Sequence, residues 1–294
     1  MLTAADFRGS YTAIVTPFGA DGLTLDLGRL REQIHFQARG GTRGIVVAGT
    51  TGESPTLSEA EYRALLSAAV EVGRPLGLQV IAGTGSNSTA HAVHLQQLAE
   101  QCGADAALSV NPYYTKPTQE GLYRHFVAQA DASGLPVMLY NIPGRTGVAL
   151  SPETVERLAA HPKIVAIKEA TGSTDSCGEI AMRCPRMAVL SGDDTMTLPF
   201  ASVGAVGVVS VLSNLFPEKV AGLCRAYLGG DFKAALAAHR ELIPLARAMF
   251  IETNPIPVKA AMKLLGRDAG TLRLPMTEAR PETVAALKKV LGVG

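Results

Sequence analysis

Residues 164–170 read IVAIKEA, a run that stays apolar for four residues before Lys168 and shows no alternation of polar and apolar side chains. A strand with one solvated face alternates, whereas a strand buried on both faces is apolar throughout. The run therefore predicts a strand of a parallel sheet that helices cover. Seven other short runs rich in Val, Ile and Ala share this character, at residues 11–16, 44–49, 78–82, 104–110, 136–140, 187–190 and 205–211.

Helical patterns lie between these runs. Ser58 and Glu61 form the capping pattern S-x-x-E ahead of apolar residues at helical spacing. Successive strands start between 18 and 34 residues apart, which suits right-handed βαβ units, and eight such units favour a closed (β/α)8 TIM barrel. An open doubly wound sheet is the alternative, but residues 83–88 read GTGSNS and lack the third glycine of its G-x-G-x-x-G fingerprint.

The end of the chain shows no further strand-like run. Four stretches after residue 216 have helical character, at residues 217–228, 232–250, 257–265 and 281–291. We therefore expect a catalytic barrel over residues 1–215 and a C-terminal helical region over residues 216–294. The length of 294 residues agrees with this division, because a single barrel commonly takes about 250 residues.

The composition excludes several classes of partner. Hydrophobic residues make up 47% of the chain, enough for a full core, and 27 Lys and Arg balance 26 Asp and Glu to a net charge of +1. Without a summed positive field and without Trp, the chain is not expected to bind nucleic acid or an anionic membrane. No run approaches the ~18 apolar residues of a membrane span, and the first residues show no signal-peptide pattern. We expect a cytoplasmic protein that acts on a small molecule.

Lys168 is the most informative single residue. It lies inside a strand that should be buried, where an unpaired ammonium group is costly. One explanation is an ion pair with Glu169 or another acid, although neighbouring residues of a strand point to opposite faces. The other is catalytic, because burial lowers the pKa of a lysine and the neutral amine can form a Schiff base with a carbonyl substrate. We rank the second explanation first and keep both.

Other polar residues follow the expected strands, where the active sites of (β/α)8 barrels lie. Tyr140 ends the strand before that of Lys168 and could exchange protons there together with the hydroxyl of Thr50; a core tyrosine is the alternative. Residues 49–52, GTTG, present backbone N–H groups suited to a carboxylate or phosphate. Arg145 follows a Pro-Gly turn and could hold a carboxylate in two parallel bonds, or lie on the surface.

No metal or cofactor is predicted. His91 and His94 share one helix face, but no third ligand follows at a recognisable spacing, so a solvated face is expected. Asp193 and Asp194 could bind Mg²⁺, but the strand ends supply few other acids, so we interpret the pair as capping or hydrogen-bonding residues. A Walker loop and a G-x-S-x-G elbow do not occur in the sequence.

Eight short motifs follow one another along nearly the whole chain. They are GTTGES at 49–54, GTG at 83–85, NPYY at 111–114, YNIPGRT at 140–146, IKEATG at 167–172, SGDD at 191–194, GVVSV at 207–211 and NPIPVK at 254–259. In this order the motifs are highly specific together. The chain resembles the dihydrodipicolinate synthase and N-acetylneuraminate lyase superfamily, and is most similar to its synthase branch.

The resemblance implies a lyase that condenses pyruvate with L-aspartate 4-semialdehyde to 4-hydroxy-tetrahydrodipicolinate, a step of lysine and diaminopimelate biosynthesis. Lys168 would form the Schiff base with pyruvate, and a proton relay in that family matches Tyr140, Thr50 and Tyr114. The second tyrosine of NPYY enters the neighbouring subunit's site in that family. Tyr114 therefore implies an oligomer, and a homotetramer built as a dimer of dimers is expected.

The same resemblance assigns substrate-binding residues. Thr51 would hold the carboxylate of pyruvate and Arg145 that of the semialdehyde, while Gly192 and Val209 would line the site. Arg145 also discriminates within the superfamily, because the sialic acid lyases carry small or apolar residues at this position. Two alternatives stay open: a Schiff-base aldolase or dehydratase acting on another 2-keto acid, and a noncatalytic barrel that binds a keto acid.

Regulation by lysine is a further implication of the resemblance. Members that lysine inhibits bind it at positions that match four residues here, Ser54, Leu57, Asn87 and Tyr113. Three other matching positions depart from the pattern of the inhibited enterobacterial type, with Glu59 and Tyr62 in place of histidines and His91 in place of a glutamate. Loss of an acid that could pair with the lysine ammonium weakens binding, although Glu59 could compensate. We predict weak or absent inhibition by lysine.

Overall fold

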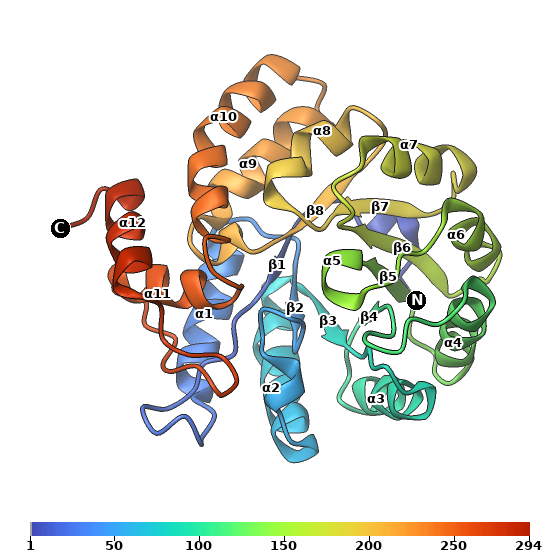
Figure 1. Ribbon diagram of the computed structural model, residues 1–294, viewed down its shortest axis with the longest axis horizontal. Helices are drawn as coiled ribbons and strands as arrows, with labels where there is room; N and C mark the ends of the chain where they lie inside the picture. Colours follow the sequence, from blue (N-terminus) through green and yellow to red (C-terminus); the bar gives the residue numbers. More distant parts are fainter. Residues whose placement is uncertain (1) are drawn as a thin grey trace.

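The computed structural model describes residues 2–294 and contains a closed barrel of eight parallel strands (Figure 1). Each strand pairs in parallel with the next one along the chain, and the last pairs with the first. The strands are β1 (Gly9–Ala13), β2 (Gly44–Val47), β3 (Gln79–Gly83), β4 (Ala106–Val110), β5 (Val137–Asn141), β6 (Ile164–Glu169), β7 (Ala188–Ser191) and β8 (Gly207–Ser210). Each overlaps one of the eight predicted runs, with ends that differ by one or two residues where the strand extends past the run, and the predicted (β/α)8 barrel is confirmed.

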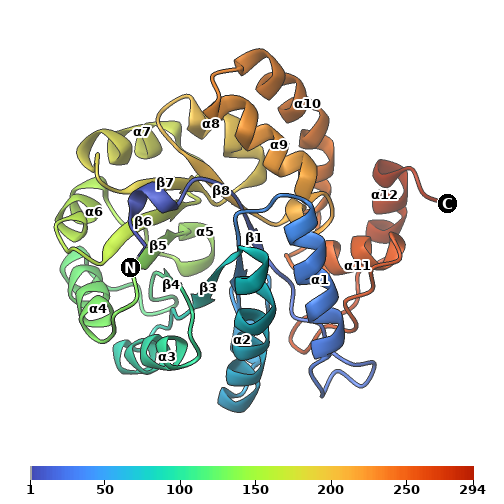
Figure 2. The same cartoon turned by 180° about the vertical axis from the view of Figure 1, so that it is seen from behind.

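Burial on both faces explains why these strands lack polar alternation. All six residues of β6 are buried. Ala166 packs in the barrel interior, whereas Ile167 packs outward beneath the helices. The amino end of the barrel is closed by the N-terminal segment, whose Phe7 is fully buried in the interior cluster. Figure 2, from behind, shows this segment lying across the strands.

Helices between the strands form the outer layer (Figures 1 and 2). They are α1 (Leu27–Arg39), α2 (Glu59–Gly73), α3 (Thr89–Gln101), α4 (Gln119–Asp131), α6 (Pro152–Ala159), α7 (Thr174–Arg183) and α8 (Thr197–Ala201), with the single turn α5 (Pro143–Thr146) directly after β5. Short 3-10 turns are η1 (Ala4–Asp6), η2 (Ser54–Thr56), η3 (Arg74–Leu76), η4 (Asp194–Met196) and η5 (Leu212–Asn214). The predicted capping box of α2 is present, because the Glu61 amide donates to Ser58 Oγ and the Ser58 amide donates to the Glu61 carboxylate.

The chain after β8 is helical, as expected. It forms α9 (Pro217–Leu228), α10 (Phe232–Ala248), α11 (Ile256–Leu264) and α12 (Pro281–Leu291). Helix α9 packs against β1 as well as against α10, so the covering layer of the barrel continues past residue 215. The division of the chain after that residue stays a prediction.

The segment around α11 returns to the carboxyl ends of the strands. The Phe18 amide, in the loop after β1, donates to the Ala269 carbonyl oxygen, and Arg273 contacts Gly22, Leu23 and the α2 residue Glu61. Figure 1 shows α11 beside α1 at the edge of the barrel. This return places C-terminal residues next to the loop that follows β2. Among residues 2–294, no helix is both long enough and apolar enough to span a membrane.

Candidate active site

Lys168 and Tyr140 lie side by side at the carboxyl ends of β6 and β5. They are register partners across the two strands, and Lys168 Nζ is 4.0 Å from the centre of the Tyr140 ring. Both side chains belong to the barrel interior and are buried, with Lys168 only 5% exposed. The predicted proximity of the two residues is therefore present.

The surroundings of Lys168 favour a neutral amine. Burial lowers the pKa of Lys168 to about 7, the positive charge of Arg145 acts in the same direction, and the carboxylate of Asp194 opposes both. Glu169 does not pair with the amine, because its carboxylate lies on the other face of β6 and accepts hydrogen bonds from Asn141 Nδ2 and the Thr171 amide. Of the two explanations for this lysine, the geometry favours the nucleophile over the ion pair with Glu169.

Asp194 is the acid whose charge raises the pKa of Lys168, but its carboxylate is hydrogen-bonded to other groups. Its carboxylate accepts hydrogen bonds from Ser210 Oγ and from the amides of Val211 and Leu212, at 3.0 Å for each amide. Burial raises the pKa of Asp194. Asp193 accepts from the Thr195 amide at the start of η4. Both acids thus act as the hydrogen-bonding and capping residues that the sequence indicated.

Tyr140 and Thr50 line the same cavity. Burial raises the pKa of Tyr140 to about 12, while Arg145 and a hydrogen bond with Thr50 act against that rise. The hydroxyl of Thr50 therefore lies on the same side of the barrel as the phenol next to the amine of Lys168. Tyr114, the third residue expected in the relay, is not there: it is 88% exposed on the surface of this chain.

The two predicted carboxylate-binding residues are joined by Asn254. Asn254 Nδ2 donates to Thr51 Oγ1 at 2.9 Å, and the Asn254 carbonyl oxygen accepts from Arg145 Nη2 at 3.3 Å. Thr51 lies on the loop after β2, Arg145 lies on α5, and Asn254 precedes α11. Sequence analysis did not name Asn254 as a site residue, although its motif NPIPVK places polar residues at the start of an apolar helix.

Comparisons with known proteins agree with this arrangement. Residues 6–293 match the model of the dihydrodipicolinate synthetase family. This chain belongs to the dihydrodipicolinate synthetase family. It is 50% identical over 289 residues to a 4-hydroxy-tetrahydrodipicolinate synthase of Leptospira biflexa, which covers 97% of each chain.

Solved structures of the family superpose closely. The dihydrodipicolinate synthase of Aquifex aeolicus is 46% identical, with a TM-score of 0.94 over 97% of each chain. The dihydrodipicolinate synthase of Acinetobacter baumannii, solved in complex with pyruvate, is 41% identical, with a TM-score of 0.94 over 97% of this chain and 98% of that one. The fold and the family expected from the sequence are both confirmed.

Gly192 and Val209 are the two residues that the family resemblance predicts to line the site. Val209 on β8 is fully buried in the barrel interior. Gly192 directly follows β7, and a Cβ atom there would stand 3.1 Å from both Cγ and Cε of Lys168 and 2.8 Å from Cβ of Ala170. A side chain at Gly192 would therefore displace the stem of Lys168, which explains a glycine beside this lysine.

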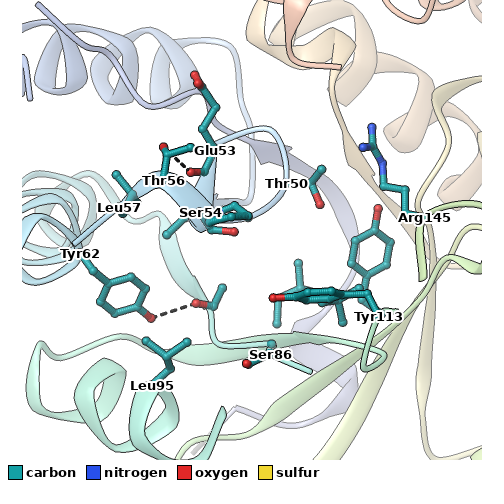
Figure 3. A pocket seen from close by; sticks show the side chains of 18 of the residues that line it. Thr50, Glu53, Ser54, Thr56, Leu57, Tyr62, Ser86, Leu95, Tyr113 and Arg145 are labelled. Atoms are coloured by element: carbon teal, nitrogen blue, oxygen red, sulfur yellow. Dashed lines mark hydrogen bonds between the residues drawn. The ribbon is translucent and has the colours of Figure 1, made fainter. Parts of the chain in front are cut away.

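A cavity of about 370 Å³ is lined by Thr50, Tyr140 and Arg145 of the candidate site. Figure 3 shows Thr50 and Arg145 facing each other across one end, with Tyr62 and Leu95 at the other. Three of the four predicted lysine-binding residues line the cavity, Ser54, Leu57 and Tyr113, as do all three departures from the inhibited pattern, Glu59, Tyr62 and His91. The fourth residue, Asn87, is exposed outside the lining.

At the end of the cavity opposite Thr50 and Arg145, the polar groups that could bind an amine already have partners within the chain. The Glu59 carboxylate is engaged by His94 Nε2 at 2.9 Å and by Arg63 Nη2 at 3.2 Å. These partners lower the pKa of Glu59, His94 first. The hydroxyl of Tyr62 donates to the Gly83 carbonyl oxygen at 3.0 Å. The carboxylate that could replace a missing acid is thus already paired with side chains of its own chain.

Proposed function

We propose that this chain condenses pyruvate with L-aspartate 4-semialdehyde to 4-hydroxy-tetrahydrodipicolinate, in the biosynthesis of lysine and diaminopimelate. The observation that carries the proposal is the buried amine of Lys168 against Tyr140, in a chain 50% identical over 289 residues to a synthase of that name. A solved structure of that name shares the barrel that holds these residues. We place the protein in the cytoplasm, where that biosynthesis occurs.

Lys168 acts as the nucleophile. Its neutral amine adds to the keto carbon of pyruvate, and water leaves as the imine forms. Loss of a methyl proton then gives an enamine, whose carbon attacks the aldehyde carbon of the second substrate. The amino group of that substrate displaces the lysine from the imine carbon, which closes the ring and restores the free amine. The reaction uses an amine and hydroxyl groups, so no cofactor or metal is part of the proposal.

Tyr140 and Thr50 move the protons that these steps require. Imine formation needs a proton on the departing hydroxyl, and enamine formation needs a base for the methyl proton. A phenol whose pKa is raised to about 12 by burial stays protonated at neutral pH and can donate. The nearby hydroxyl of Thr50, which acts on the pKa of Tyr140, gives that proton a route away from the amine.

Thr51 and Arg145 hold the two carboxylates. Thr51 lies on the loop 49–52, whose backbone N–H groups suit the carboxylate of pyruvate. The guanidinium of Arg145 lines the cavity and suits the carboxylate of the semialdehyde. Gly192 and Val209 complete the wall next to Lys168.

Tyr114 completes the relay from a second copy of the chain. We propose a homotetramer, built as a dimer of dimers, in which Tyr114 of each subunit enters the site of its neighbour. Its exposure of 88% and its left-handed backbone, with φ of 72°, support this role because a single chain gives neither feature a purpose. Tyr113 beside it lines the cavity of its own chain.

Lysine inhibits this enzyme weakly or not at all. The pairing of Glu59 with His94 and Arg63 supports this expectation. Glu59 is the only acid among the three residues that depart from the inhibited pattern, and its carboxylate already has partners, so it is not available to the ammonium group of lysine. Without a free acid, lysine would be bound only through its α-amino and α-carboxylate groups. The residues left for this are Ser54, Leu57, Asn87 and Tyr113. Initial rates at increasing lysine concentration test the expectation, and half-maximal inhibition at low concentration contradicts it.

A coupled assay tests the proposed reaction. Purified protein is mixed with pyruvate, L-aspartate 4-semialdehyde, the reductase that consumes the product and its nicotinamide cofactor, with Lys168→Ala as the control. Oxidation of the cofactor that disappears in the variant supports the synthase and its lysine together. No oxidation, with the reductase shown to be active, rejects the synthase. Borohydride trapping of pyruvate on Lys168 then separates an aldolase or dehydratase of another 2-keto acid from a noncatalytic binding barrel.

A further inference from the structure

The loop that carries Thr50 and Thr51 has a strained residue at each end. Ala48 and Glu53 both adopt left-handed backbone conformations, with φ of 53° and 54°. Such conformations cost a residue other than glycine about 1–3 kcal/mol and persist only where the surroundings impose them. Two site hydroxyls therefore stand on a loop that its neighbours must hold in place.

The Ala48 end is held by close backbone packing. A Cβ atom added to Gly83 would lie 2.1 Å from the Ala48 carbonyl oxygen, so β3 presses directly on this end. The Glu53 end is held through its side chain instead. Figure 3 shows the Glu53 side chain directed away from Thr50 and Arg145.

Glu53 forms a fully enclosed ion pair with Lys259 of α11. Lys259 Nζ is 2.6 Å from Glu53 Oε1, and the two side chains are 3% and 1% exposed. Glu53 Oε2 accepts a hydrogen bond from the Arg273 amide, and Lys259 Nζ donates to the Thr271 carbonyl oxygen. Removing two charges from water costs several kcal/mol for each, and apolar residues of similar size commonly stabilise a fold at least as well. Stability alone therefore does not account for this pair.

The same helix region also holds the middle of the loop. Asn254, five residues before Lys259, donates to Thr51 Oγ1. Helix α11 and the segment before it thus contact the loop at two residues, Thr51 and Glu53. The ion pair fixes the left-handed end, and the amide fixes the hydroxyl that faces the substrate.

We propose that Glu53 and Lys259 are positioning residues for the 2-keto acid. Neither touches the substrate; their ion pair keeps the loop in the conformation in which Thr51 meets the carboxylate and Thr50 meets Tyr140. The proposal rests on the proposed function only in taking a 2-keto acid as the ligand of Lys168. A loop released at Glu53 would present these hydroxyls out of register, and misplacement of about 1 Å can cost on the order of 100-fold in rate.

Glu53→Gln and Glu61→Gln form a matched pair for the test. Each replaces a carboxylate by its isosteric amide, and each acid pairs with a cation of the C-terminal segment, Lys259 for Glu53 and Arg273 for Glu61. Glu61 lies on α2 beyond the loop that carries the site hydroxyls. The readouts are the KM for pyruvate, the rate of borohydride trapping of pyruvate on Lys168, and the thermal midpoint of unfolding.

We expect Glu53→Gln to raise the KM for pyruvate at least about tenfold and to slow trapping in proportion, while Glu61→Gln changes both less than about twofold. Equal effects of the two variants, or a lowered thermal midpoint with unchanged KM, overturn the proposal. If Glu53→Gln does not fold, the double variant Glu53→Gln/Lys259→Met leaves no unpaired buried charge. A wild-type KM in that double variant also overturns the proposal.

The trapping arm separates this inference from the proposed function. It needs only pyruvate and the amine of Lys168, without the semialdehyde. If the wild-type protein forms no trapped adduct, the proposed function fails. If the wild type is trapped and Glu53→Gln is trapped equally fast at low pyruvate concentration, the positioning role fails while the proposed function stands.

Discussion

The molecule buries two lysines near the same end of the barrel, one with a paired carboxylate and one without. Lys168 and Lys259 are 5% and 4% exposed, and burial lowers the pKa of both. Lys259 has a carboxylate at 2.6 Å that acts against this shift. Both amines lie over an aromatic ring, Tyr140 for Lys168 and Phe18 for Lys259. The acids near Lys168, however, are hydrogen-bonded to other partners. In the roles that we propose, the buried amine without a paired carboxylate, Lys168, is the nucleophile, and the buried amine with one, Lys259, positions the loop.

The largest difference between the two lysines is expected in activity. Lys168→Met removes the only amine at the strand ends that we assign to the Schiff base, so condensation falls by at least about 10³-fold and borohydride traps no pyruvate. Lys259→Met leaves that amine in place, so trapping continues at a reduced rate. Steady-state rates and the mass of the trapped protein check both outcomes. Trapping that survives in Lys168→Met would break the comparison.

Arg145→Ala separates the charge next to Lys168 from the chemistry of the amine itself. Loss of the guanidinium removes the partner of the semialdehyde carboxylate, so kcat/KM for the semialdehyde falls about 100-fold while the pyruvate imine still forms. The measurement compares coupled rates at varied semialdehyde with borohydride trapping of pyruvate alone. An equal loss in both would contradict the role assigned to this residue.

Stability should respond to the two lysines with opposite signs. Below pH 7 the amine of Lys168 is protonated in the folded and unfolded chain, and the folded chain bears the full cost of burying the charge. Lys168→Met therefore raises the free energy of unfolding most at or below pH 7. Between pH 7 and 10.5, only the unfolded wild-type chain keeps the proton, so the stability of the wild type rises and the gain shrinks by about 1.4 kcal/mol per pH unit.

Lys259→Met should instead lower the free energy of unfolding at pH 7 by about 3 kcal/mol, because it leaves the Glu53 carboxylate buried without its partner. Denaturant unfolding of both variants and the wild type at pH 6, 7 and 9 measures these differences. A gain for Lys168→Met that does not change with pH would show that its amine is not desolvated in the folded chain.

Sequence analysis anticipated the site of Lys168 better than that of Lys259, for a physical reason. The apolar run around Lys168 and the alternation of strand faces are local features, and neighbouring strands in a barrel follow chain order, so Tyr140 could be placed beside it. The contacts of the C-terminal segment are not local. Asn254 meets Thr51 across 203 residues, and no periodicity in the sequence encodes which loop a helix end will reach.

The position of Tyr114 shows another limit of a single chain. Its motif marks it as functional, yet it is 88% exposed in this chain, so its role rests on the oligomer that we propose. Glu53 was visible in the motif GTTGES, but its left-handed backbone and the direction of its side chain depend on contacts with Lys259 of α11 and with the Arg273 amide. Local pattern reveals which residues are unusual, and tertiary contact decides what each one does.

The smallest expected effect concerns the fine adjustment of the amine of Lys168. Arg145 and Asp194 act on its pKa in opposite directions. Arg145→Ala removes a like charge, so the pKa of Lys168 rises and pyruvate trapping begins at higher pH. Asp194→Asn removes an opposite charge, so the pKa falls and trapping begins at lower pH, while the amide oxygen can still accept from Val211 and Leu212.

Rates of trapping from pH 5 to 9 measure the two midpoints against that of the wild type near pH 7. Displacements of opposite sign can arise from electrostatics, whereas a general loosening of the barrel would hydrate the amine and move both midpoints upward. If both variants move upward, the low pKa of Lys168 depends on the tightness of its enclosure alone. If they move in opposite directions, the opposing charges of Arg145 and Asp194 set the pKa of Lys168. Lys259 differs, because its amine is paired directly with the Glu53 carboxylate.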